Sequence, residues 1–176
     1  MHRLLVLALL ATAAFAAETT IDPCADPKGW AFSKGDEFPG ATGSLTAMPA
    51  GGLALAWDFS AGGAYVSVQP KAKLPAGTAA VAASLTTDKP CTVAWRMRDE
   101  NGRTFQSDYI TLPAGTTRLV RTVAGPWGGS WGGKPDTAAT PAAPVAFTLL
   151  VDKRKGTPVS GSVGITAITA LDAAPR

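Results

Sequence analysis

The sequence predicts an all-β domain, an antiparallel β-sandwich of jelly-roll type with roughly eight to ten strands. Two observations carry this prediction. Short segments alternate apolar and polar residues, which is the pattern of a strand with one buried face. Turn-forming residues, among them 19 glycines and 14 prolines, interrupt these segments about every 8–15 residues, and no segment shows a helical period.

The first four predicted strands span residues 53–59, 64–69, 79–86 and 91–98. Each places aliphatic or aromatic side chains on one face and smaller or polar side chains on the other. The residues expected to face inward are Leu53, Leu55, Trp57, Phe59, Val66, Val68, Val81, Ala83, Leu85, Val93, Trp95 and Met97. We therefore expect every one of these strands to contribute one face to a shared core.

The later predicted strands span residues 103–112, 116–123, 145–151 and 159–171. The Asn-Gly pair at 101–102 predicts a hairpin turn before the first of them, because this dipeptide readily adopts positive φ angles. Pro-Ala-Gly at 113–115 predicts the next turn. The basic cluster Lys-Arg-Lys at 153–155 precedes a glycine and a proline, so we expect it to form a solvated turn between the last two strands.

The segment Gly-Pro-Trp-Gly-Gly-Ser-Trp-Gly-Gly at 125–133 holds two of the five tryptophans, Trp127 and Trp131. Because glycine disfavours helix and strand interiors, we expect this segment to be a loop, within an irregular stretch from about 124 to 144. Two exposed indoles there would form a binding platform, with Lys134 and Asp136 as neighbouring polar groups. The alternative is that one or both indoles fold inward and cover an edge of the sandwich.

A second candidate binding surface is the polar side of the predicted strands. Tyr65, Arg96, Arg98, Gln106 and Asp108 would line a concave sheet face there. These side chains supply both the donors and the acceptors that a hydroxyl-rich ligand needs. The alternative is a solvated or ion-paired face without a ligand.

The first 17 residues predict a secretory signal peptide, with Arg3 before an apolar run and small residues at the cleavage site. The apolar run is too short to span a bilayer, and no other segment is long enough. Residues 18–176 are then expected to form one domain in a secreted or periplasmic protein. Loss of Arg3 lowers the net charge from +3 to about +2, too little for nucleic-acid binding.

The only histidine, His2, lies in the predicted signal peptide. The rest of the chain therefore excludes a Ser-His-Asp triad, a Cys-His pair and a histidine-ligated zinc site, and we expect no cofactor. The two cysteines, Cys24 and Cys91, are expected to form a disulfide, because exported chains commonly pair an even number of cysteines. The alternative is two separate reduced thiols.

Carboxylates leave two further kinds of site open. Asp36, Glu37 and Asp172 lie near the two ends of the predicted domain and are candidate ligands for a structural calcium ion. Asp58 and Asp108 lie on the polar faces of their predicted strands and are a candidate carboxylate pair for glycoside hydrolysis. For both sets the alternative is that the carboxylates are solvated or paired with nearby basic residues.

Several segments, taken in order, resemble non-catalytic carbohydrate-binding-module-like domains of the galactose-binding-like jelly-roll type. They are Trp-Ala-Phe-Ser at 30–33, Glu-Phe-Pro-Gly-Ala-Thr-Gly at 37–43, Leu-Ala-Trp-Asp-Phe-Ser at 55–60, Gly-Ala-Tyr-Val at 63–66, Arg-Asp-Glu-Asn-Gly-Arg-Thr-Phe-Gln at 98–106 and Trp-Gly-Gly at 131–133. Such domains occur in bacterial secreted proteins and beside glycoside hydrolases. The resemblance implies a jelly-roll fold, a secreted setting and glycan binding.

We therefore expect a secreted, non-enzymatic module that binds a polysaccharide or other glycan weakly through its aromatic loop. Covering ~100 Å² of apolar sugar surface with an indole contributes about 2.5 kcal/mol. Two such platforms, less the cost of association, give affinities of roughly mM to μM. Two alternatives stay open: a structural or adhesive cell-envelope domain without a sugar site, and a carboxylate-dependent glycosidase or lyase.

Overall fold

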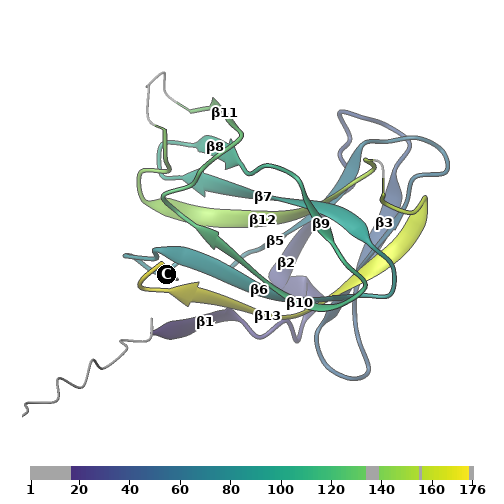
Figure 1. Cartoon of the computed structure of the whole chain (residues 1–176), viewed down its shortest axis with the longest axis horizontal. Helices are drawn as coiled ribbons and strands as arrows, with labels where there is room; N and C mark the ends of the chain where they lie inside the picture. The colour runs from purple at the N-terminus through teal and green to yellow at the C-terminus, as the bar shows by residue number, and fades with distance from the viewer. Residues whose placement is uncertain (1–16, 134–138, 155, 175–176) are drawn as a thin grey trace, which may run out of the picture.

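The computed structural model describes residues 17–133, 139–154 and 156–174. It is a sandwich of two antiparallel sheets, as the alternating sequence pattern predicts (Figure 1). The six-stranded sheet contains β1 (Glu18–Asp22), β3 (Thr42–Ala47), β4 (Leu53–Asp58), β6 (Ala80–Thr87), β10 (Gly115–Thr122) and β13 (Ser160–Leu171). The seven-stranded sheet contains β2 (Trp30–Ser33), β5 (Tyr65–Pro70), β7 (Cys91–Asp99), β8 (Arg103–Gln106), β9 (Ile110–Leu112), β11 (Gly129–Gly132) and β12 (Pro144–Asp152). A short 3-10 helix, η1 (Pro27–Gly29), leads into β2.

The strand order places segments that are distant in the sequence side by side. The six-stranded sheet runs β10-β6-β13-β4-β3, with β1 added to β13, and the seven-stranded sheet runs β11-β8-β7-β12-β5-β2, with β9 added to β7. In Figure 1, β8, β7 and β12 lie above β6 and β13. The centre of the seven-stranded sheet is β12, which pairs with both β5 and β7.

The core fills the space between the two sheets. The twelve inward-facing residues of the first four predicted strands are all buried, none with more than 3% of its surface exposed. Trp95 packs against Phe147 from β12, with the ring centroids 5.5 Å apart. Trp57 packs on Gly161, where an added Cβ would lie 2.6 Å from the indole, and its N–H donates to the carbonyl of Pro158 at 3.0 Å.

The glycine-rich segment 125–133 is not entirely a loop, so that part of the prediction is wrong. Gly129–Gly132 forms β11, which pairs antiparallel with β8 and sets Trp131 opposite Thr104. β11 lies at the edge of its sheet, so it forms hydrogen bonds with a neighbouring strand on one side only. All four of its residues are exposed, so its glycines lose no core packing. The sequence pattern also missed β1, β2 and β3, and it joined β8 and β9 into one strand.

The predicted disulfide is absent from this structure, because Cys24 and Cys91 are both free and buried. Cys24 lies between β1 and η1, and its thiol contacts the carbonyl of Asp22 at 3.7 Å. Each sulfur packs within the main core as a small apolar group. Burial, followed by the charge of Asp22, raises the pKa of the Cys24 thiol to about 12, so this thiol is protonated at neutral pH.

Several expectations concern residues outside the described ranges: the signal peptide up to residue 16, the polar groups Lys134 and Asp136, and Lys155. The other two members of the basic cluster, Lys153 and Arg154, do lie in the connection between β12 and β13. Within the described ranges, the chain forms no helix with the length and hydropathy that a bilayer crossing requires.

Candidate functional site

The outer face of the seven-stranded sheet carries the candidate site. Side chains alternate along a strand, so the residues between the core positions point away from the core. The registers of the paired strands bring these outward residues together on one surface. We call it the groove face, and it consists of Tyr65, Ser67, Gln69, Ala94, Arg96, Arg98, Thr104, Gln106, Trp131, Thr148, Leu150 and Asp152.

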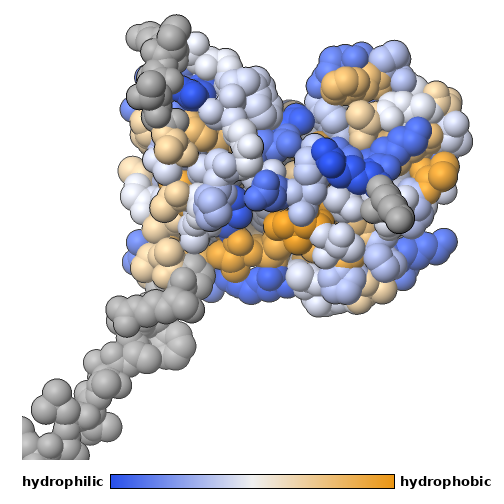
Figure 2. All heavy atoms as spheres, turned by 45° about the horizontal axis from the view of Figure 1, so that its top comes forward, coloured by the Kyte–Doolittle hydropathy of each residue, from blue (hydrophilic) through white to orange (hydrophobic). Residues whose placement is uncertain are grey.

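The groove face is hollowed where β5 begins and β12 ends. A groove of about 610 Å³ lies there, lined by Phe38, Gly63, Ala64, Tyr65, Arg96, Gln106, Tyr109, Asp152, Lys153 and Arg154. Figure 2 shows the surface notched between two lobes, with hydrophilic residues around the notch. Tyr65, Ala94 and Leu150 form a small buried cluster on this side of the sheet, so the outer face has an apolar base beneath its polar groups.

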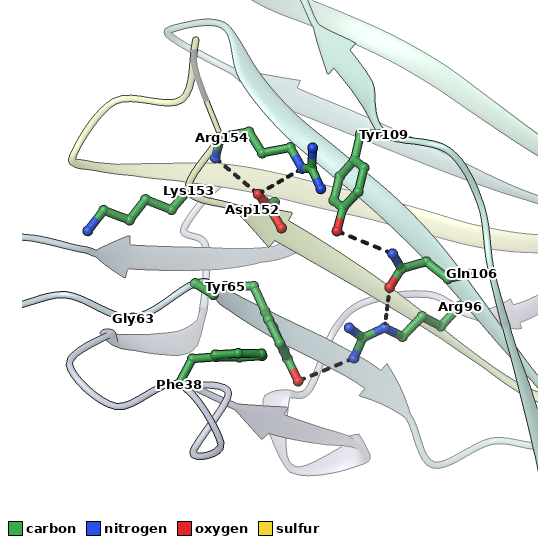
Figure 3. A pocket seen from close by; sticks show the side chains of 10 residues that line it. Phe38, Gly63, Tyr65, Arg96, Gln106, Tyr109, Asp152, Lys153 and Arg154 are labelled. Carbon is green, nitrogen blue, oxygen red and sulfur yellow. Dashed lines mark hydrogen bonds and ion pairs between the residues drawn. The ribbon is translucent and has the colours of Figure 1, made fainter. Parts of the chain in front are cut away.

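A hydrogen-bonded chain of side chains crosses the groove (Figure 3). Arg96 donates through Nε to Oε1 of Gln106 at 2.8 Å and through Nη1 to the hydroxyl of Tyr65 at 3.3 Å. Nε2 of Gln106 donates to the hydroxyl of Tyr109 at 3.3 Å, and the hydroxyl of Tyr65 donates to Oε1 of Glu37. These bonds fix the polar groups of three strands in place before a ligand arrives.

The network shifts the pKa values of two of its members. The hydrogen bond from Tyr65 is the main reason that the pKa of Glu37 lies below its ordinary value. Burial, followed by the bond to Glu37, raises the pKa of Tyr65, while Arg96 acts in the opposite direction. At neutral pH Tyr65 in the groove is therefore neutral, and Glu37 beside the groove is ionised.

Asp152 and Arg154 form another wall of the groove. Oδ1 of Asp152 accepts a hydrogen bond from the backbone N–H of Arg154 at 3.0 Å and lies 3.4 Å from its Nε. Burial raises the pKa of Asp152, and its contacts with Arg154 partly offset this effect. The guanidinium of Arg154 lies 3.6 Å from the centre of the Tyr109 ring, so a cation–π contact holds this wall against the adjacent loop.

Exposed aromatic rings flank the groove. Trp131 is 48% exposed, and the guanidinium of Arg96 lies 5.3 Å from the centre of its ring. Phe38, in the connection between β2 and β3, is 52% exposed and meets Tyr65 edge to face, with the ring centroids 6.3 Å apart. Arg96 also lies 4.6 Å over the ring of Tyr65. One guanidinium thus links an exposed ring on the edge strand with a ring inside the groove.

Trp127 does not share this surface. Its ring packs against the main core and lies 6.1 Å from the ring of Phe105. Its indole N–H donates to the carbonyl of Val123 at 3.0 Å, and the guanidinium of Arg121 lies 4.9 Å over the ring. The two indoles of the glycine-rich segment are therefore separated: Trp131 joins the groove face, and Trp127 folds inward.

The groove brings together three of the five sheet-face candidates, Tyr65, Arg96 and Gln106. Arg98 lies on the same face but lines a second hollow. Asp108 lies in the connection between β8 and β9, beside Gly128. The suggested pairing of Asp108 with Asp58 is wrong, because Asp58 ends β4 in the other sheet and the two carboxylates share no polar face.

The three calcium candidates are not gathered into a site. Asp36 lies 3.6 Å from Nζ of Lys34, Glu37 accepts its bond from Tyr65, and Asp172 accepts from the backbone of Ala17 at 2.8 Å. Within residues 17–133, 139–154 and 156–174, no cluster of three or more Asp, Glu, His or Cys side chains is arranged to hold a metal ion. Each of the three carboxylates instead contacts a different donor group.

The sequence pattern did not indicate five of the side chains that line the groove: Phe38, Tyr109, Asp152, Lys153 and Arg154. A signal was present for Asp152, since extending the predicted strand 145–151 by one residue keeps it on the outward side. Phe38 and Tyr109 lie in connections between strands, where no periodicity indicates which way a side chain points. Arg154 was assigned to a solvated turn, and the structure sets it against an aromatic ring.

The sandwich matches solved carbohydrate-binding modules. The family 11 module from Clostridium thermocellum, in complex with a β-1,3-1,4-mixed-linked tetrasaccharide, aligns over 93% of this chain and 100% of its own, with a TM-score of 0.63 and 12% identity. A family 29 module variant complexed with mannohexaose aligns over 91% of this chain and 94% of its own, with a TM-score of 0.52 and 13% identity.

The same fold also occurs as part of longer chains. The agarase AgWH50C aligns over 89% of this chain but only 25% of its own, with a TM-score of 0.57 and 10% identity. The sequence itself matches no protein-family model and no curated protein. At identities this low the likeness establishes the fold alone: the chain is a β-sandwich of the carbohydrate-binding-module type.

Proposed function

We propose that this domain binds a polysaccharide along its groove face and does not cleave it. The observation that carries the proposal is the groove itself: Tyr65 and Phe38 line it, Trp131 flanks it, and a hydrogen bond holds Arg96 and Gln106 in place between them. A sugar ring has an apolar C–H face and a rim of hydroxyls. Flat rings suit the first, and fixed donors and acceptors suit the second.

Trp131 is the group expected to contribute most to affinity. Its ring is half exposed on an edge strand, so a sugar can cover it without moving the core. Covering ~100 Å² of apolar surface contributes about 2.5 kcal/mol. After the cost of association, the expected dissociation constant is roughly mM to μM.

The carboxylates of the groove favour binding over hydrolysis. Glycoside hydrolases commonly place two carboxyl groups on either side of the scissile bond. Of the described residues that line the groove, Asp152 alone carries a carboxylate, and Arg154 is its ion-pair partner. The neighbouring Glu37 accepts from Tyr65 and has a lowered pKa, which makes it a poor general acid.

Affinity electrophoresis against a panel of soluble polysaccharides tests the proposal. The wild type is compared with Trp131→Ala and with the control Val159→Ala, which removes an exposed apolar side chain outside the groove lining. At least one polymer should retard the wild type, Trp131→Ala should weaken that binding about 10- to 60-fold, and the control should match the wild type. The proposal fails if no polymer retards the wild type, if Trp131→Ala binds as the wild type does, or if reducing ends are released.

We also propose that the chain is exported, with residues 1–17 as its leader. The support is the charged start, the apolar run and the small residues at the cleavage site. N-terminal sequencing of the protein recovered from the periplasm or medium should begin at Glu18. Recovery of intact Met1 in the cytoplasmic fraction would contradict this proposal.

A further inference from the structure

A second hollow continues the groove face at the other ends of the same strands. It has a volume of about 430 Å³ and is lined by Gln69, Pro70, Lys71, Ala72, Lys73, Arg98, Asp99, Glu100, Gly102, Val145 and Ala146. Tyr65 lines the first hollow and Gln69 the second, four residues apart on one face of β5. At ~3.3 Å per residue this separation is about 13 Å, so one extended polymer can reach both hollows.

Basic residues outnumber acidic ones in the two hollows. The described basic residues lining them are Lys71, Lys73, Arg96, Arg98, Lys153 and Arg154, and the described acidic ones are Asp99, Glu100 and Asp152. Thus six of the chain's 16 basic residues line this one surface, against three of its 13 acidic residues. The chain as a whole is nearly balanced, so the surplus of positive charge is a property of this surface.

Two of these three acidic residues already interact with donor groups of neighbouring residues. Asp152 pairs with Arg154. Asp99 is only 1% exposed, and one of its carboxylate oxygens accepts from the backbone N–H of Arg103 at 2.8 Å. Glu100 is the exposed acid that remains to oppose the basic side chains of the second hollow.

The basic side chains of the second hollow are available to a ligand. Within the described ranges, Arg98 and Lys73 are exposed and form no hydrogen bond or ion pair with another side chain. Nζ of Lys71 donates to the carbonyl of Lys28 at 2.8 Å, which orients one ammonium beside them without neutralising it. A guanidinium in this state can receive a carboxylate or a sulfate through two parallel hydrogen bonds.

We infer that the polysaccharide is acidic, with carboxylate or sulfate groups that bind at Arg98, Lys71 and Lys73 while its sugar rings lie over Trp131 and the first hollow. This inference rests on the proposed function. Arg98 and Trp131 lie in one cross-strand row, since both register with Thr104 of β8. An anionic substituent on a sugar near the indole therefore faces the free guanidinium across a single strand.

Binding measurements with a neutral β-glucan, a polyuronate, a sulfated galactan and polyphosphate at equal ionic strength test the inference. The variant is Lys73→Gln/Arg98→Gln. The control Lys89→Gln/Arg118→Gln removes the same two charges outside both hollows. We expect the wild type to bind an acidic polymer about tenfold or more tightly than the neutral one, the variant to lose about tenfold of that affinity, and the control to stay within about twofold.

The outcomes separate this inference from the function on which it rests. Tighter binding to the polyuronate, the sulfated galactan or both than to the neutral polymer, with that preference lost in the variant, supports the inference and shows which anionic group is recognised. If the neutral polymer binds as tightly and the variant behaves as the wild type, the inference fails and glycan binding stands. If polyphosphate binds as tightly as the acidic glycans, charge alone is recognised and the inference fails. If no polymer binds, both fail.

Discussion

Replacing Trp127 with alanine should destabilise the domain, whereas replacing Trp131 should not. The two tryptophans lie four residues apart in the same glycine-rich segment, yet the structure gives them different partners. Trp127 packs on the main core and on Phe105, and its N–H is bound to a backbone carbonyl. Trp131 is 48% exposed on an edge strand.

The contacts of Trp127 set the size of the effect. Truncation of a buried tryptophan to alanine costs about 3–5 kcal/mol, and the lower end applies to a ring that is only half buried. The substitution also exposes Arg121, whose Nε and one terminal nitrogen have no hydrogen-bond partner among the described residues, so their hydration offsets part of this loss. A loss of about 3 kcal/mol corresponds to a fall in Tm of roughly 6–12 °C for a domain of this size. Trp131→Ala should change the stability by less than about 0.5 kcal/mol.

Thermal and urea unfolding of both variants, followed by circular dichroism, give these values, and polysaccharide binding is measured in parallel. We expect the two effects to be separate: Trp127→Ala lowers Tm, and Trp131→Ala lowers the affinity for the polysaccharide. A Trp127→Ala variant with unchanged Tm and lost binding would refute the inward packing of this ring. It would restore a platform made of both indoles, as the sequence first suggested.

Three further predictions concern single groups. Unfolding the protein without a reductant should expose two reactive thiols, whereas in the native protein neither Cys24 nor Cys91 should react with a thiol reagent. Absence of reactive thiols after unfolding would mean that the two cysteines form a disulfide. Gly161→Ala should cost about 1–3 kcal/mol in urea unfolding, because the new Cβ would meet a buried indole at 2.6 Å, and a neutral result would contradict that contact. In an NMR titration the pKa of Glu37 should lie below its ordinary value and rise in Tyr65→Phe. A lowered pKa means that this group stabilises the fold above its unfolded-state pKa and loses that contribution as pH falls, so an unchanged pKa in the variant would refute the hydrogen bond.

The sequence sufficed for the sandwich because each central strand has one buried face. Val93, Trp95 and Met97 alternate with outward residues on β7, and this parity fixes which side chains enter the core. The same reasoning failed for β1, β2 and β3. These strands lie at the edges of their sheets and bury few side chains. Their sequences therefore lack the alternation of apolar and polar residues that marks a strand with one buried face. Edge pairing depends on the neighbouring strand, which a local pattern does not encode.

The candidate site could be predicted in part for the same reason. Tyr65, Arg96 and Gln106 lie on regular strands, and the alternation placed all three on one face, as the structure shows. The glycine-rich segment carries no period at all. Whether Trp131 points to the groove depends on pairing with β8, and whether Trp127 points inward depends on core space near Phe105. Both are tertiary effects that no local pattern in the sequence reports.

Strand parity also separates stability from recognition in this fold. On β7 the odd-numbered residues fill the core, while Arg96 and Arg98 lie on the groove face, and a shift of one residue would exchange the two sets. Substitutions at Arg96 and Arg98 can therefore change which ligand is bound while the core contacts of the odd-numbered residues are kept. Two sandwiches with the same core pattern can then carry unrelated grooves. That is the physical reason why a structural likeness at about 12% identity establishes the fold, while the ligand has to be argued from the residues on the outer face.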